Sequence, residues 1–129
     1  MNTPRLVIVD DSALMRQAIE MVLDCQYEVV ASVPDGEGAV TAAARFAPEL
    51  VLLDISMPGV NGFEAARQIK LASPVTSIIF VSEHERKSYV DAGFLAGASG
   101  YVFKNQIASD LAPAIRTVLA GKEFGRPVT

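Results

Sequence analysis

The chain has 129 residues, a length that suits one domain of ordinary size and excludes a large multidomain enzyme. Half of its residues are hydrophobic and 20% are charged, so it can bury a core and is not expected to be disordered. Eleven basic and fifteen acidic residues give a net charge of −4, which disfavours direct contact with nucleic acid or with an anionic membrane.

Short apolar runs and longer runs of helical period alternate from the start of the chain. The first part is predicted to form, in order, strand 5–9, helix 12–24, strand 27–33, helix 37–46 and strand 50–53. Ser12 is a good N-cap for the first helix, whose expected buried stripe is Leu14, Ala18, Met21 and Val22. Met15 and Cys25 are also expected in the core.

The second part continues the same alternation with helix 62–72, strand 77–81, helix 87–96, strand 100–103 and helix 107–119. The helix at 62–72 places Phe63, Ala66 and Ile69 on one face, and the last helix has the clearest amphipathic pattern. The apolar residues of helix 87–96 cannot all point inward, so we expect one of its faces to meet a partner: Tyr89, Val90, Phe94 and Leu95.

Five strands alternating with five helices predict an α/β fold in which a doubly wound parallel sheet lies between two helical layers. Most of the strands are continuous runs of Val, Ile, Leu or Phe, so we expect them to be buried on both faces. No linker interrupts the pattern, which predicts a single domain over residues 1–129. Ligands of such sheets bind where the strands end at their carboxyl edge.

Polar side chains close four of the five predicted strands. Asp10 and Asp11 follow the first strand, Asp54 the third, Ser82 the fourth and Lys104 the fifth. We expect the strands that end in Asp54 and Ser82 to flank the first strand, which would bring the three aspartates together. Because adjacent carboxylates repel one another and no histidine or cysteine accompanies them, the cluster predicts a Mg²⁺ site.

The same set of side chains suits phosphoryl chemistry. A carboxylate can act as nucleophile toward phosphorus, Mg²⁺ offsets the charge, and a lysine and a serine can hold the phosphoryl oxygens. Taken singly, a strand-terminal aspartate is more often a helix cap, and Lys104 or Ser82 alone is more often a solvated end or a cap. Their joint placement at one sheet edge favours the functional interpretation.

Four segments carry a resemblance that spans about residues 5–120: VIVDDS at 7–12, LLDISMPGVNG at 52–62, FVS at 80–82 and GASGYVFK at 97–104. Together they resemble the receiver domain of bacterial two-component response regulators. The resemblance implies a flavodoxin-like sandwich with strand order 2-1-3-4-5. It also implies a cytoplasmic protein, in keeping with a single cysteine and the absence of any apolar run long enough for a signal peptide or membrane helix.

The resemblance assigns a role to each site residue. It implies that Asp54 accepts a phosphoryl group from a sensor histidine kinase or phosphotransfer protein. The implied Mg²⁺ ligands are Asp10 (through water), Asp11, Asp54 and the backbone carbonyl of Ser56. Ser82 would be the switch hydroxyl, Lys104 the lysine that pairs with the phosphoryl group, and Tyr101 the switch aromatic.

The implied function is a signalling switch that assists only its own phosphorylation and dephosphorylation and is otherwise not an enzyme. One alternative is a degenerate receiver that serves as a phosphorylation-independent docking module. A second is a small Mg²⁺-dependent phosphatase, which the lack of an acidic residue two positions after Asp54 disfavours.

Two residues, Glu83 and Asn105, depart from the common family pattern, and His84 and Ser56 border the site. Glu83 follows the switch serine where a small residue is usual, which predicts altered phosphorylation kinetics. His84 is interpreted as a solvated loop residue, with a role in placing or excluding water as the alternative, and Ser56 as a residue that tunes phosphate lifetime. Asn105 stands where many receivers have proline, which weakens the expectation of a cis peptide bond.

Residues 97–124 are similar to receivers of the NarL/LuxR type, which usually precede a DNA-binding helix-turn-helix and act in transcription regulation. Nine residues, 121–129, remain from Gly121, where the last predicted helical segment stops, and these are too few for two further helices. We therefore expect no effector domain within the chain, which is either a stand-alone receiver or part of a longer regulator. A second copy of the chain is a further candidate partner.

Overall fold

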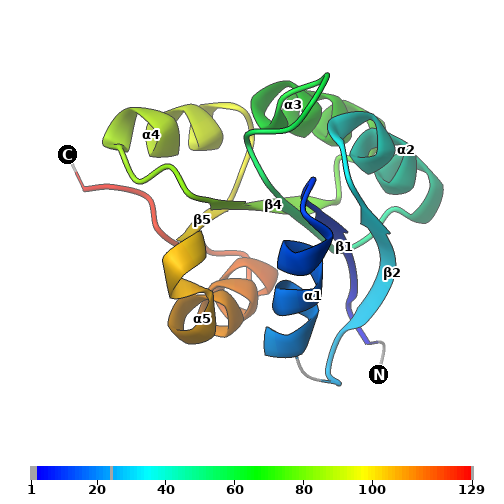
Figure 1. Ribbon diagram of the computed structural model, residues 1–129, viewed down its shortest axis with the longest axis horizontal. Coiled ribbons are helices and arrows are strands. Elements are labelled where there is room, and N and C mark those ends of the chain that lie inside the picture. The colour runs from blue at the N-terminus through cyan, green and yellow to red at the C-terminus, as the bar shows by residue number, and fades with distance from the viewer. Residues whose placement is uncertain (1–2, 24, 129) are drawn as a thin grey trace.

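The computed structural model describes residues 3–23 and 25–128. Five parallel strands form one sheet in the order β2-β1-β3-β4-β5, with helices on both of its faces (Figure 1). The strands are β1 (Arg5–Val9), β2 (Glu28–Val33), β3 (Leu50–Leu53), β4 (Ser77–Ser82) and β5 (Gly100–Phe103). The helices are α1 (Ala13–Val22), α2 (Gly36–Phe46), α3 (Gly62–Ala72), α4 (Lys87–Leu95), a 3-10 turn η1 (Lys104–Gln106) and α5 (Ile107–Leu119). The predicted fold class and strand order are confirmed.

The predicted element bounds agree with the structure to within one or two residues where it describes them. Asp24, the expected last residue of the first helix, lies outside the described residues, and α1 ends at Val22. Ser12 caps α1 as expected, because its side chain accepts a hydrogen bond from the Met15 amide at 3.2 Å.

The neighbours of β1 differ from one expectation. β1 pairs with β2 and β3, whereas β4 lies beyond β3, so the expectation that the strand ending in Ser82 flanks the first strand is wrong. The pairing of β1 with β3 is in register, with Val9 beside Leu53. The residues that follow these two strands, Asp10 and Asp54, are therefore neighbours.

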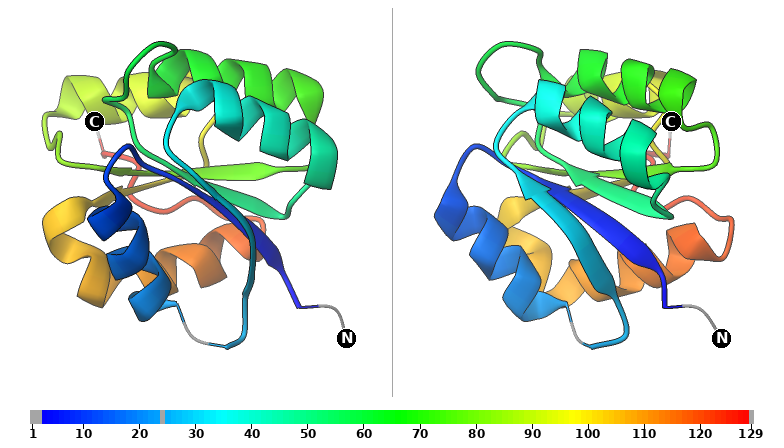
Figure 2. Two further views of the ribbon diagram at one scale, coloured as in Figure 1. Left: turned by 45° about the vertical axis from the view of Figure 1, so that its right-hand side comes forward. Right: turned by 90° about the vertical axis from the view of Figure 1, so that its right-hand side faces the viewer.

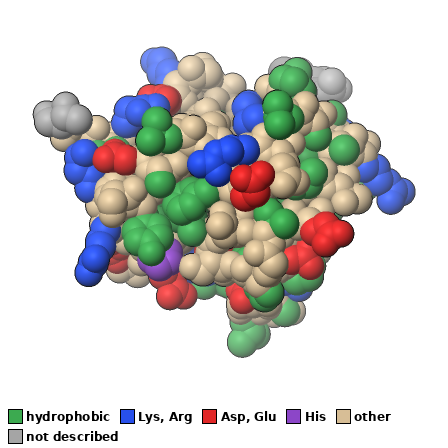
Figure 3. Space-filling view, turned by 90° about the horizontal axis from the view of Figure 1, so that it is seen from above, with side chains coloured by type: hydrophobic (Ala, Val, Ile, Leu, Met, Phe, Trp, Pro, Cys, Tyr) green, Lys and Arg blue, Asp and Glu red, His purple; other side chains and the backbone are tan. Residues whose placement is uncertain are grey.

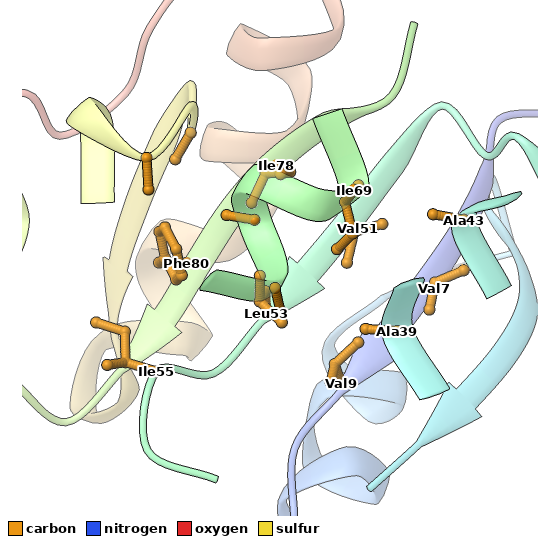
Figure 4. Packing of buried hydrophobic residues seen from close by; sticks show 14 of the residues in the cluster. Val7, Val9, Ala39, Ala43, Val51, Leu53, Ile55, Ile69, Ile78 and Phe80 are labelled. Atoms are coloured by element: carbon orange, nitrogen blue, oxygen red, sulfur yellow. The ribbon is translucent and has the colours of Figure 1, made fainter. Parts of the chain in front are cut away.

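Two hydrophobic clusters, one on each face, hold the sheet between its helical layers. Figure 2 shows α2, α3 and α4 on one face and α1 and α5 on the other. Side chains alternate along each strand, so Val7 and Val9 point toward α2 and α3 while Leu6 and Ile8 join the cluster beneath α1 and α5. Figure 4 shows Val7, Val9, Val51, Leu53, Ile78 and Phe80 packing with Ala39, Ala43 and Ile69. This two-sided burial fixes the strands, and with them the positions of the residues that follow.

Burial on both faces is confirmed for β1, β3 and β4 but is wrong for β2. No residue of β2 is fully buried, and Glu28 and Ser32 are exposed. β2 is an edge strand, paired only with β1, so its side chains reach the end of the helical layers rather than their middle.

The stripe expected to be buried on α1 is wrong at Leu14 and Met21, whereas Val22 packs against the core as expected. Ile19 is the buried residue of this helix, whereas Leu14 is 78% and Met21 85% exposed. Met15 packs against the cluster that contains Ile19, as expected, but Cys25 is exposed rather than buried. Leu14 and Met21 lie on a second apolar stripe that faces away from the sheet.

The faces predicted for α3 and α5 are confirmed, whereas a partner for α4 stays a prediction. Ala66 and Ile69 of α3 are buried, and Phe63 is half-buried. Leu111, Ala114, Ile115 and Val118 of α5 are buried. On α4, Val90 and Phe94 are buried while Leu95 is 86% exposed.

The described residues also bear on two expectations, one about a cis peptide bond and one about a membrane-spanning helix. Residues 3–23 and 25–128 contain no cis peptide bond. Within those ranges, no helix has both the length and the apolar character that a membrane span requires.

The chain returns to the sheet after α5, which the sequence pattern did not indicate. It turns at Gly121, where φ is +86°, and Phe124 then forms a parallel bridge with Gly100 at the free edge of β5. We call residues 122–128 the strap.

Candidate functional site

The carboxyl ends of the strands enclose a polar pocket of about 230 Å³. Its lining residues come from the ends of β1, β3, β4 and β5: Asp11, Asp54, Ser56, Glu83, His84 and Lys104. Asp10 lies buried beside it and contacts Lys104. The structure therefore brings the aspartates and Lys104 together, as the placement of the strand ends predicts.

Backbone hydrogen bonds between the strands hold the two buried aspartates. The Asp54 amide donates to the carbonyl of Val9 at 3.0 Å, and the Asp10 amide donates to the carbonyl of Val33 at 3.1 Å. The side chains are fixed as well, because Asp54 Oδ1 accepts from the Ile55 amide at 2.8 Å and Asp10 Oδ1 accepts from the Ser12 amide at 2.9 Å. Each carboxylate keeps Oδ2 available for another partner.

Lys104 provides the positive charge between these carboxylates. Its Nζ lies 2.8 Å from Asp10 Oδ2 and 3.3 Å from Asp54 Oδ2, and its side chain is only 10% exposed. The contact with Asp54 is a hydrogen bond, whereas Asp10 Oδ2 is buried and has no hydrogen bond from any described residue. One lysine thus faces two buried carboxylates, and one of their oxygens still lacks a hydrogen-bond partner.

The pKa shifts reflect this imbalance. Burial raises the pKa of Asp54 above its ordinary 3.8, and the nearby charge of Asp10 raises it further, while Lys104 opposes both. Burial by itself would lower the pKa of Lys104, but its contacts with Asp10 and Asp54 outweigh burial and raise it above 10.5. The lysine stays charged, and the charge of Asp54 is disfavoured where it stands.

A divalent cation would relieve this situation. Asp10, Asp11 and Asp54 each offer a carboxylate oxygen, and these oxygens all lie within 4.8 Å of one another. All three are hard oxygen donors of the kind Mg²⁺ prefers, and Asp10 Oδ2, whose contact with Lys104 is an ion pair without a hydrogen bond, is one more acceptor for a metal-bound water. The donor set therefore fits Mg²⁺. Ser56 lines the same pocket, and the role of its carbonyl as a ligand stays a prediction.

Ser82 and Tyr101 meet at the loop after β4 rather than at the carboxylates. Ser82 is fully buried, and its Oγ accepts a hydrogen bond from the His84 amide at 3.0 Å. The Tyr101 hydroxyl donates to the His84 carbonyl at 2.7 Å. The two expected switch residues are therefore joined through the backbone of one intervening residue.

His84 is the site residue whose surroundings the sequence interpretation missed. Its Nε2 lies 2.9 Å from the Ser56 hydroxyl, and its ring stacks on Tyr89 with centroids 4.0 Å apart and planes 3° from parallel. Figure 3 shows the histidine, in purple, lying against hydrophobic side chains at the surface. The solvated-loop interpretation is wrong. The available sequence signal was an aromatic residue at the start of the next helix, five positions along.

The Ser56 to His84 hydrogen bond spans the mouth of the pocket. It joins the loop after β3 to the loop after β4, the two loops that carry Asp54 and Ser82. Glu83 is exposed and also lines the pocket, so its carboxylate adds negative charge at the rim. Access to Asp54 is thus bordered by residues outside the predicted site.

A larger hollow of about 430 Å³ lies elsewhere, between β2 and α2. Its lining includes Val33, Thr41, Arg45 and Phe46. None of the strand-end carboxylates lines it, so the volume of a hollow does not identify the chemical site in this molecule.

Comparison with known proteins gives a consistent result. Residues 6–116 match the family described as the response regulator receiver domain. The chain is 37% identical over 128 residues to the transcriptional regulatory protein DegU of Brevibacillus brevis, covering 98% of this chain and 54% of that protein. It is 34% identical over 123 residues to the oxygen regulatory protein NreC of Staphylococcus epidermidis, covering 93% of this chain and 56% of that protein. The chain thus spans about half the length of these curated relatives.

Solved structures agree. A two-component response regulator of the LuxR family from Aurantimonas sp. SI85-9A1 superposes with a TM-score of 0.91 at 31% identity, covering 98% of this chain and 91% of that one. The response regulator domain of Thermotoga maritima CheB superposes with a TM-score of 0.85 at 28% identity, covering 92% of this chain and 98% of that one.

Proposed function

The chain belongs to the family of response regulator receiver domains of two-component systems, and we propose that Asp54 is the residue on which it accepts the phosphoryl group. The observation that carries this proposal is the placement of Asp54. Asp54 lines the polar pocket; its Oδ2 lies 3.3 Å from Lys104 Nζ, while Oδ1 accepts from the Ile55 amide. A nucleophile, a cation and a metal-binding carboxylate pair therefore meet in one small volume.

In the proposed reaction, an Asp54 carboxylate oxygen attacks the phosphorus of a phosphohistidine in a sensor kinase or phosphotransfer protein. The new O–P bond forms as the P–N bond to the imidazole breaks, and the leaving imidazole takes up a proton. Asp10, Asp11, Asp54 and the Ser56 carbonyl would hold Mg²⁺. When bound, this ion would offset the negative charge of the transferring group.

Lys104 and Ser82 have separate parts in this proposal. Lys104 already faces Asp54 and would pair with a phosphoryl oxygen, because a charged donor makes a stronger hydrogen bond than a neutral one. The hydroxyl of Ser82 would leave the His84 amide and turn toward the phosphoryl group. Tyr101 would follow the rearrangement, because its hydroxyl is bound to the same residue.

The wider setting of the switch belongs to the same proposal. We infer that residues 1–129 act as one receiver domain without an effector domain of their own, in the cytoplasm, and that the phosphorylated form controls a partner or a DNA-binding effector. Support comes from relatives described as transcriptional regulatory proteins, of which this chain covers 54% and 58%. A sensor histidine kinase and a second copy of the chain are the proposed partners, without direct contact between this domain and nucleic acid.

A phosphodonor experiment tests the proposal. Incubation with acetyl phosphate and Mg²⁺ should add the mass of one phosphoryl group to the intact protein, and Asp54→Asn should abolish the adduct completely. Asp91→Asn is the matched control, because Asp91 lies on α4, pairs with Lys87 and does not line the pocket. An unmodified wild-type protein, or an adduct that survives in Asp54→Asn, would overturn the assignment.

Neither alternative function gains support from the family match. A phosphatase would turn over a phosphoester continuously, whereas the proposed switch forms one adduct per chain. A docking module would bind its partner equally well with Asp54→Asn. These two measurements separate the three functions.

A further inference from the structure

The strap occupies the edge of the sheet that β5 would otherwise leave open. Phe124 pairs with Gly100 in parallel, its amide donates to the Ser99 carbonyl at 3.0 Å, and its carbonyl accepts from the Tyr101 amide at 3.0 Å. Its ring packs against the cluster beneath α1 and α5. Figure 1 shows this segment, in red, passing β5 on its way from α5 toward α4. The strap therefore takes the position of a sixth strand.

The close approach of strap and strand requires a glycine. Gly125 has φ of +87°, and a Cβ atom at this position would lie 2.5 Å from the Tyr101 carbonyl oxygen. Both its backbone conformation and its contact with β5 exclude a side chain. The strap is thus packed specifically against β5 and does not form a loose tail.

The strap also contacts α4. The guanidinium of Arg126 lies 4.5 Å from the centre of the Phe94 ring, and Glu123 holds the same guanidinium through two hydrogen bonds of 2.7 and 2.8 Å. The start of α4 has no side-chain cap, and its first turn is held through the stacking of Tyr89 on His84. Arg126 therefore clips the strap to the helix that follows the Ser82 loop.

Tyr101 connects the strap to the pocket. Its backbone amide donates to Phe124, and its hydroxyl donates to the carbonyl of His84 in the loop beside the pocket. The His84 amide is in turn bound to Ser82 Oγ. A continuous path of hydrogen bonds thus runs from the switch serine to the strap.

We propose that the strap is a conformational reporter that is seated on β5 and α4 while the pocket is empty and loosens when the pocket is loaded. This inference rests on the proposed function of Asp54. A phosphoryl group on Asp54 offers the Ser82 hydroxyl a charged acceptor, which competes with its present bond to the His84 loop. Release of that loop frees the uncapped start of α4, and movement of α4 takes Phe94 away from Arg126.

Amide hydrogen exchange with a phosphoryl mimic tests the proposal directly. The probe is beryllofluoride with Mg²⁺, and fluorine NMR reports whether it is bound. With the probe bound, the amides of Tyr101 and Phe124 should exchange faster, whereas the Val51 amide in the middle of the sheet should not change. Absence of a bound fluorine signal would count against Asp54 as the acceptor. A bound signal with unchanged exchange at Tyr101 and Phe124 would overturn the role of the strap alone.

Linkage gives a second, reciprocal measurement. If loading loosens the strap, variants that loosen it beforehand should bind beryllofluoride more tightly, by about fivefold at the lower end of ordinary coupling. The contact between the Arg126 guanidinium and the Phe94 ring is here called the clip. Arg126→Ala removes its cation, and Phe94→Leu removes its ring. Arg67→Ala is the matched control, since Arg67 is also an exposed arginine paired with a glutamate three residues earlier. Unchanged or weaker binding in both clip variants would overturn the proposal.

Discussion

Buried polar groups occur at both ends of the sheet, and the two ends are built differently. At the amino ends of β3 and β4, the Thr76 hydroxyl donates to the Pro48 carbonyl at 2.7 Å and lies 2.7 Å from the Ser73 hydroxyl. All of these groups are neutral. At the carboxyl ends, Asp10 and Asp54 are charged, share Lys104, and leave Asp10 Oδ2 without a hydrogen bond.

The difference separates a structural network from a functional one. A buried neutral group costs little once it is hydrogen-bonded, so the Thr76 network contributes to stability and needs nothing further. Two buried carboxylates with one cation remain unbalanced until another positive charge arrives. In the proposed function, this charge imbalance prepares the carboxyl end of the sheet for a metal ion and a phosphoryl group.

Removal of Lys104, the cation that Asp10 and Asp54 share, should have the largest effect on stability. Lys104→Met leaves two buried carboxylates facing each other, and we expect it to lower the free energy of unfolding by about 3 kcal/mol. Urea denaturation at neutral pH without Mg²⁺ measures the loss. Adding Asp10→Asn to this variant should restore part of the stability, because one of the repelling charges is removed. Equal stability of Lys104→Met and the wild type would contradict the charge imbalance.

A substitution at the amino ends of β3 and β4 should lower the stability of the protein without changing its phosphorylation. Thr76→Val keeps the shape of the side chain but leaves the Ser73 hydroxyl and the Pro48 carbonyl without their partner, at a cost of about 1–3 kcal/mol. Phosphorylation by acetyl phosphate should proceed as in the wild type when measured well below the unfolding transition. A loss of phosphorylation in the folded variant would show that the two ends are not independent.

A substitution at the rim of the pocket should have a smaller effect, on the rate at which the aspartyl phosphate is hydrolysed. His84→Phe retains an aromatic ring to stack on Tyr89 but removes the bond to the Ser56 hydroxyl, so the two loops are no longer joined across the mouth. We expect the aspartyl phosphate to hydrolyse several-fold faster, because water reaches Asp54 more easily. Loss of the phosphoryl mass over time measures the rate. Glu85→Gln, one residue further along the loop, is the control and should leave the lifetime unchanged.

The smallest expected effect is a change in pH dependence. Burial raises the pKa of Tyr101 above its ordinary 10.0, the nearby Ser82 hydroxyl opposes this, and the charge of Asp54 adds to the rise. Above pH 10 the unfolded chain therefore releases this proton before the folded chain does, so stability falls as the pH rises through that range. Tyr101→Phe should remove this part of the decline in denaturation curves at high pH. An equally steep decline in the variant would contradict a raised pKa.

The positions of the residues at the strand ends could be predicted from the sequence because the topology of a parallel sheet determines them. In a parallel sheet all strands finish at one edge, so Asp10, Asp54 and Lys104 had to come near one another once the strands were identified. Helix faces were harder. α1 carries two apolar stripes, one with Leu14 and Met21 and one with Met15 and Ile19, and only the position of α5 decides which is buried.

The remaining features depend on contacts between segments far apart in the chain. His84 is placed by Ser56, 28 residues away, and nothing in its own neighbourhood indicates that bond. The strap has no regular alternation of apolar residues, and a single bridge at Phe124 defines its place beside β5. Such contacts follow from the assembled fold, not from local periodicity.

Gly62, the first residue of α3, gives the fold a further property. It is buried, and a Cβ atom at this position would collide with the Asp54 carbonyl and with the backbone of Ile55. Any larger residue would push the helix away from the peptide that carries Asp54, the proposed phosphoacceptor. In a scan of all substitutions, position 62 would therefore be as intolerant as position 54, although it has no reactive group. Residues that hold the backbone of Asp54 in place should therefore be as sensitive to substitution as Asp54 itself.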